Sequence, residues 1–166
     1  MSASGLKSLP AIGFLTICNY SEAGFSGGYL VLNAAGRPLE FHCTAPVKPN
    51  RAQEILYGPT LRPFLFGEQI GQTLVSRSKV SPLLVITDSE PVLAVRAYCE
   101  IPVACVLSED REGALRLGQQ SVTFDRAYLR DAEAARALWT QHFENFDLAE
   151  PFDRIREALE ESRKAA

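Results

Sequence analysis

The side chains with the greatest capacity for chemistry gather between residues 27 and 71. A histidine and a cysteine, His42 and Cys43, stand next to each other there, and such a pair could form a thiol nucleophile with its base. The pair is predicted on a strand, however, where neighbouring side chains point to opposite faces and cannot hydrogen-bond to each other. Cys43 shares its predicted face with Leu39 and Phe41, which favours a buried thiol over a catalytic one.

A second candidate is an anion site beside the helix predicted over residues 51–57. Asn50 is a typical N-cap, and the cations Lys48 and Arg51 flank it at the end of the helix that favours negative charge. Two prolines remove amide donors nearby and there is no glycine-rich loop, so a capped helix with solvated basic side chains is the favoured interpretation. If this region holds a ligand pocket, its predicted lining is His42, Thr44, Lys48, Asn50, Arg51, Glu54, Tyr57 and Glu68.

No metal site and no cofactor are predicted. Two histidines and four cysteines are the obvious soft ligands, but they are scattered without the short spacing of a metal-binding pair. Cys43 and the other cysteines lie within apolar runs and are expected to be reduced, buried thiols. His142 lies on an apolar helical stripe and is predicted to be a core residue.

The hydrophobic pattern predicts an α+β fold with a mainly antiparallel sheet, in a profilin-, longin- or roadblock-like sandwich with C-terminal helices. Residues 1–10 are predicted to be a flexible leader, residues 11–128 the α+β domain, and residues 129–166 a helical segment packed on the same domain. The predicted strands cover residues 14–20, 29–33, 39–44, 83–87, 92–96 and 101–107, with a hairpin in 114–124; the predicted helices cover 51–57, 61–77, 131–143 and the segment from residue 151.

Composition narrows the classes of partner. The 166 residues are 46% apolar and 22% charged, and the net charge is −3 with acids and bases interspersed, so no basic stripe suggests a nucleic-acid partner. No apolar run approaches the roughly 20 residues of a membrane span, and the first residues lack the apolar core of a signal peptide. We therefore expect a cytoplasmic protein with neither a membrane nor a nucleic-acid partner.

The run GGYLVLNAAGRPLEFHCTAPVKPNRAQEILYGPTL, continued by FGEQIG, resembles a conserved family of uncharacterised bacterial proteins. The resemblance covers roughly residues 13–107. It implies a bacterial cytoplasmic protein and transfers no functional residue.

The leading hypothesis from the sequence is a non-enzymatic interaction or scaffold domain that forms a homo-oligomer or docks another protein. The helix predicted over residues 61–77 is apolar on two sides, and surplus apolar surface in a small domain often becomes an interface. The alternative is a small-molecule or anion-binding sensor or enzyme with a pocket near His42–Tyr57; whether the protein is an enzyme stays open, with a non-enzyme favoured. The predicted interface residues are Leu61, Phe64, Leu65, Glu68 and Val75.

Overall fold

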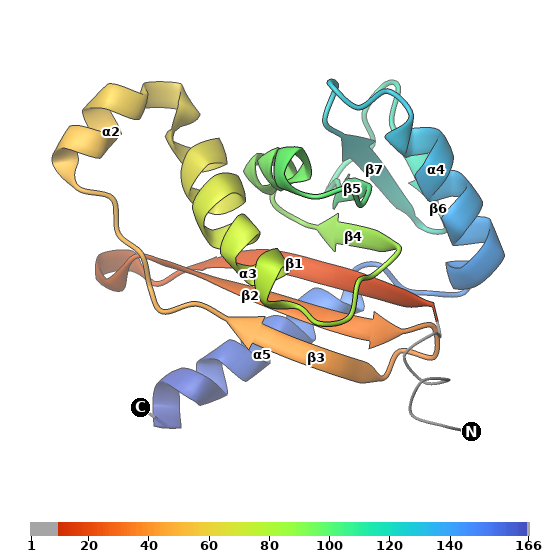
Figure 1. Cartoon of the computed structure of the whole chain (residues 1–166), viewed down its shortest axis with the longest axis horizontal. Helices are drawn as coiled ribbons and strands as arrows, with labels where there is room; N and C mark the ends of the chain where they lie inside the picture. Colours follow the sequence, from red (N-terminus) through yellow and green to blue (C-terminus); the bar gives the residue numbers. More distant parts are fainter. Residues whose placement is uncertain (1–9, 166) are drawn as a thin grey trace.

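A computed structural model describes residues 10–165 and contains one seven-stranded mixed sheet (Figure 1). The first half of the chain forms a three-stranded meander and a helical crossover. Its elements are β1 (Ala11–Asn19), η1 (Ser21–Ala23), β2 (Phe25–Asn33), β3 (Pro38–Cys43), α2 (Arg51–Tyr57), η2 (Gly58–Thr60), η3 (Pro63–Gly71) and α3 (Gln72–Arg77). The second half contains β4 (Leu84–Thr87), η4 (Glu90–Tyr98), β5 (Val103–Val106), β6 (Leu115–Leu117), β7 (Gln120–Phe124), α4 (Asp131–Leu138), η5 (Trp139–Phe143) and α5 (Glu150–Ala165).

The strand order is β3-β2-β1-β4-β5-β7-β6, with parallel pairing at the centre. β1 pairs antiparallel with β2 on one side and parallel with β4 on the other, and β4 pairs parallel with β5. The outer pairs, β2 with β3, β5 with β7 and β6 with β7, are antiparallel. After β1 the chain adds β2 and β3 towards one edge of the sheet, and after β4 it adds β5 towards the other edge. The direction in which strands are added therefore reverses between β1 and β4.

The α+β class fits the structure, but the prediction of a mainly antiparallel, profilin-, longin- or roadblock-like sandwich is wrong. The cause is the strand predicted over residues 92–96, which is part of the helical segment η4. A helix between β4 and β5 allows the chain to return and add β5 in parallel, whereas a strand would have made an antiparallel hairpin. Pro91 in the first turn of η4 is the sequence signal for a helix start.

Helices cover both faces of the sheet and create two hydrophobic cores. On one face, η3, α3 and η4 pack on the sheet around side chains such as Phe66, Ile70 and Val95. On the other face, α4, η5 and α5 pack around Phe14, Trp139 and others. In Figure 1 the strand layer separates α3 from α5. The strand β4, which is apolar up to its last residue, Thr87, is fully buried because it lies between the two cores.

Two adjacent glycines of β2 allow both helical layers to approach the sheet closely. A Cβ atom on Gly27 would lie 2.3 Å from Cγ2 of Ile70, and one on Gly28 would lie 2.4 Å from Cγ2 of Ile155. Successive strand residues point to opposite faces, so one glycine serves each layer. This explains a pair of glycines in the interior of a buried strand.

Apart from Pro10, the predicted leader lies outside the described residues, and the predicted domain boundary at residue 128 stays a prediction. Between residues 10 and 165, no helix combines the length with the apolar character needed to cross a membrane.

Candidate functional site

The carboxyl ends of β1, β4 and β5 meet at one edge of the sheet. Parallel pairing places Thr87, the last residue of β4, opposite Leu15 of β1 and Cys105 of β5. β1 and β4 are neighbours from which the chain departs in opposite directions. In open sheets with parallel strands, ligands bind outside the carboxyl ends of the strands at such a reversal point, so this edge is the first place to look for a site.

Asp88 is the polar residue at the reversal point. It follows β4 directly, and its Oδ1 accepts a hydrogen bond of 2.6 Å from the hydroxyl of Thr16 on β1. Its Oδ2 forms an ion pair with the guanidinium of Arg156, which reaches over from α5. Residues from β1, the end of β4 and α5 therefore converge on one carboxylate.

A cavity of about 610 Å³ opens beside Asp88 at the carboxyl ends of β4 and β5; we call it the carboxyl-edge cavity. Its wall continues from the end of β5 into the loop that follows. The lining consists of Asp88, Glu90, Cys105, Val106, Leu107, Ser108, Glu109, Asp110, Arg111 and Gln120.

The charge of the carboxyl-edge cavity is predominantly negative. Four carboxylates and one guanidinium line it, a formal charge of −3, although Arg156 and Arg116 also reach Asp88 and Asp110 from outside the lining. Burial raises the pKa of the Cys105 thiol to about 12, and the nearby carboxylates of Glu90 and Asp88 contribute to the rise. The thiol is therefore protonated at neutral pH and is not a nucleophile there.

The lining carboxylates are largely engaged with arginines. Arg111 contacts Glu90 at 2.7 Å, and its hydrogen bond lowers the pKa of the Glu90 carboxyl group. Asp110 accepts hydrogen bonds from Ser121 and from Arg116, the latter at 3.4 Å. Within residues 10–165, no group of three His, Cys, Asp or Glu side chains is arranged to hold a metal ion.

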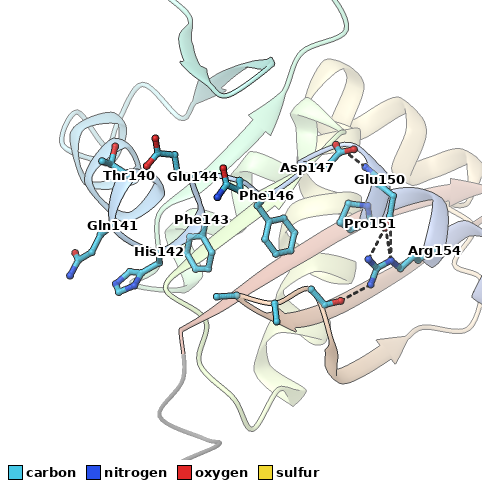
Figure 2. Close-up of a pocket in the computed structure, with 14 residues that line it drawn as sticks. Thr140, Gln141, His142, Phe143, Glu144, Phe146, Asp147, Glu150, Pro151 and Arg154 are labelled. Atoms are coloured by element: carbon cyan, nitrogen blue, oxygen red, sulfur yellow. Dashed lines mark hydrogen bonds and ion pairs between the residues drawn. The ribbon is translucent and has the colours of Figure 1, made fainter.

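A second groove, of about 480 Å³, lies between the β2–β3 turn and the segment from η5 to the start of α5 (Figure 2). Figure 2 shows the rings of His142, Phe143 and Phe146 pointing to the same side, while Thr140 and Glu144 point the other way. Two charged residues of the groove serve the fold: Arg154 donates to Gly36 O at 2.8 Å and pairs with both oxygens of Glu150. The groove thus offers the partly buried ring of Phe146 and one imidazole, since Phe143 is buried.

His42 and its neighbours on β3 hold the chain that follows α3. The imidazole lies 3.2 Å from Glu40, whose carboxylate also accepts hydrogen bonds from Ser78 Oγ and from the amides of Lys79 and Val80. Burial raises the pKa of Glu40, but these donors outweigh it and lower the pKa to about 2. The polar face of β3 is therefore occupied by a structural contact.

The Glu40 contact predicts acid sensitivity. A carboxyl group whose pKa falls on folding stabilises the protein above its unfolded pKa, near 4, and this stabilisation disappears as the pH drops towards 2. We expect Glu40→Gln to lower the free energy of unfolding by about 2–3 kcal/mol at pH 7 and by far less near pH 2. Urea unfolding of both proteins between pH 7 and pH 2 measures this; a difference that does not change with pH would contradict the assignment.

The other residues of the predicted pocket are spread from the end of β3, through α2, to η3. Asn50 caps α2 in a reciprocal capping box with Gln53, as predicted, and Arg51 pairs with Glu54 on the surface at 3.4 Å. Tyr57 stacks on Phe64 with ring centroids 4.2 Å apart. Thr44 accepts a hydrogen bond from Gly27 N and lines a cavity of about 310 Å³ with Tyr20, Pro46 and Arg163. Lys48 is exposed, and Glu68 accepts a hydrogen bond from Tyr98 OH. Ligand binding by this set stays a prediction.

The predicted interface residues do not form one exposed surface. Leu65 is 3% exposed and belongs to the core between η3, η4 and the sheet. Leu61, Phe64, Glu68 and Val75 are partly buried. The exposed apolar side chains of this region are instead Ile55 and Leu56 of α2.

Sequence reasoning missed the residues of the carboxyl-edge cavity. Asp88 and Glu90 fall between the strands predicted over residues 83–87 and 92–96, and Glu109–Arg111 follow the strand predicted over residues 101–107. The available signal is an aspartate directly after a strand that is apolar except for its last residue, because such strands are typical of buried parallel sheets with ligands at their carboxyl ends.

Comparisons with known proteins give fold-level likeness only. No protein-family model and no curated protein matches the sequence, in agreement with a family of unknown function. Similar solved structures include endonuclease V of Ciona intestinalis, as a variant bound to a 23mer DNA that contains inosine (14% identity, 64% of this chain and 49% of that chain, TM-score 0.41). Human endonuclease V is 12% identical over 67% of this chain and 51% of that chain, with a TM-score of 0.39. This chain thus spans about half the length of these two proteins, and likeness at this level transfers no site or activity.

Two predictions about function are corrected. The non-enzymatic scaffold that self-associates is not retained, because Leu65, one of its predicted interface residues, is buried within one subunit. The similar solved structures are those of endonuclease V. The exclusion of a nucleic-acid partner, which rests on the charge pattern, is not retained either; the similar solved structures include endonuclease V in complex with DNA.

Proposed function

We propose that the protein binds a small, positively charged organic molecule in the carboxyl-edge cavity. One observation carries the proposal: a cavity of about 610 Å³ at the carboxyl ends of β4 and β5, beside Asp88, which is lined by four carboxylates and one guanidinium. Its volume falls within the range of roughly 300–1,000 Å³ typical of ligand sites. Carboxylates bind ammonium and guanidinium groups through charge-assisted hydrogen bonds, which are stronger than neutral ones.

Glu109 supports a cationic ligand over an anionic one. Arg111 pairs with Glu90, Arg116 with Asp110 and Arg156 with Asp88, so Glu109 is the lining carboxylate without an ion-pair partner within residues 10–165.

The four cysteines are free thiols, and a cytoplasmic site of action, where thiols stay reduced, is part of the proposal.

The proposal is tested by nuclear magnetic resonance titration of the isotopically labelled protein. The cationic probe is agmatine, which carries one guanidinium and one ammonium group; succinate is the anionic counterpart. We expect agmatine to shift the amide signals of Val106–Arg111 and Gln120, and succinate to leave them in place. Glu109→Gln should weaken agmatine binding about threefold, as expected for one partly solvated charge. Shifts confined to other regions, or an equal response to succinate, would refute the proposal.

A further inference from the structure

The ion pair between Arg111 and Glu90 forms part of the lining of the carboxyl-edge cavity. Arg111 belongs to the loop between β5 and β6, and its Nη2 contacts Glu90 Oε1 at 2.7 Å. The two side chains are 52% and 50% exposed, so water competes strongly with the contact. The guanidinium thus fills the position that a cationic ligand would need, and it is held there weakly.

The ion pair of Asp88 differs in this respect. Its carboxylate is 23% exposed and is fixed by the Thr16 hydroxyl as well as by Arg156. Arg156 is anchored on the long helix α5, where it also contacts Asp153 at 3.3 Å. A ligand can therefore displace Arg111 from Glu90 more easily than it can displace Arg156 from Asp88.

We infer that Arg111 is an internal competitor of the ligand, a guanidinium that occupies Glu90 in the free protein and leaves when a ligand cation binds. The inference rests on the function proposed above and assigns regulation to that same cavity. In the free protein the hydrogen bond from Arg111 lowers the pKa of the Glu90 carboxyl group, so it favours the ionised form of Glu90 and balances its charge. Arg111 then sets the threshold concentration of ligand, because every binding event must first break its contact with Glu90.

The inference predicts that removal of a positive charge from Arg111 tightens cation binding more than removal of a distant one. In Arg111→Ala, agmatine should bind about two- to fivefold more tightly than in the wild type, which corresponds to the value of one exposed ion pair. Arg136→Ala on α4 is the matched control, since Arg136 pairs with Glu133 at 3.7 Å, is 61% exposed and does not line the cavity. It changes the net charge equally and should leave the affinity within about 1.5-fold.

The double variant Arg111→Ala/Glu90→Gln separates the contact from general electrostatics. Without the Glu90 carboxylate, Arg111 has no carboxylate to occupy, so the substitution Arg111→Ala should no longer tighten agmatine binding. Weaker agmatine binding in Arg111→Ala, or an equal gain in Arg136→Ala, would overturn the inference while leaving ligand binding itself intact. Absence of agmatine binding in every variant would refute both this inference and the proposed function, whereas binding with an unchanged affinity in Arg111→Ala would refute the inference alone.

Discussion

The substitution Leu65→Glu is expected to unfold the protein. Leu65 on η3 is 3% exposed and packs among the apolar side chains shared by η3, η4 and the sheet. A glutamate at this position must either bury its carboxyl group without a partner or force η3 away from the core. Either outcome costs about 4 kcal/mol or more, a large part of the 5–15 kcal/mol that stabilises a typical domain. Circular dichroism and urea unfolding measure the loss.

Leu56→Glu on α2 provides the matched control. Leu56 is 83% exposed, so the same substitution should change the free energy of unfolding by less than about 0.5 kcal/mol. A folded Leu65→Glu protein with the wild-type unfolding midpoint would show that η3 is not packed as described.

The position of Leu65 also explains why the sequence favours an interface. The two apolar sides of the helix predicted over residues 61–77 exist, but each has a partner within the same chain. One side packs on the sheet, where Ile70 and Leu74 lie against Gly27 of β2, and the other packs against η4. A strand predicted over residues 92–96 leaves the second side uncovered, so one wrong element creates an apparent surplus of apolar surface.

Features that depend on neighbouring residues could be predicted from the sequence. The bounds of α2 and its cap follow from Asn50 and Gln53, which are three residues apart, and the β6–β7 hairpin turns at Gly118, whose φ of +64° favours glycine. The cavity could not be predicted in this way. Thr16 and Asp88 are 72 residues apart and Asp88 and Arg156 are 68 apart, so their contacts arise only when the parallel strands and α5 are in place.

The second large effect is expected at the ion pair that joins η4 to α4. Arg96 donates from Nε to Asp131 at 2.8 Å and from Nη2 at 3.3 Å, and its third nitrogen donates to Cys99 O at 2.7 Å. Its guanidinium also lies over the ring of Tyr128, 4.1 Å from the centroid. The side chains of Arg96 and Asp131 are only 16% and 7% exposed. The pair therefore contributes to the stability of the fold through hydrogen bonds that are largely shielded from water.

Removal of one partner of this pair should be more harmful than removal of both. Arg96→Met leaves the Asp131 carboxylate buried without its main donor, and we expect a loss of about 3 kcal/mol in the free energy of unfolding. Arg96→Met/Asp131→Leu replaces both charges with apolar groups and should be at least about 1 kcal/mol more stable than the single variant, because no buried charge is left unpaired.

Urea unfolding of the wild type, both single variants and the double variant gives the coupling energy of the pair. Arg136→Met serves as the control on the same helix, since its ion pair is exposed and should contribute less than about 0.5 kcal/mol. A double variant that loses the sum of the two single losses would mean that Arg96 and Asp131 stabilise the fold independently.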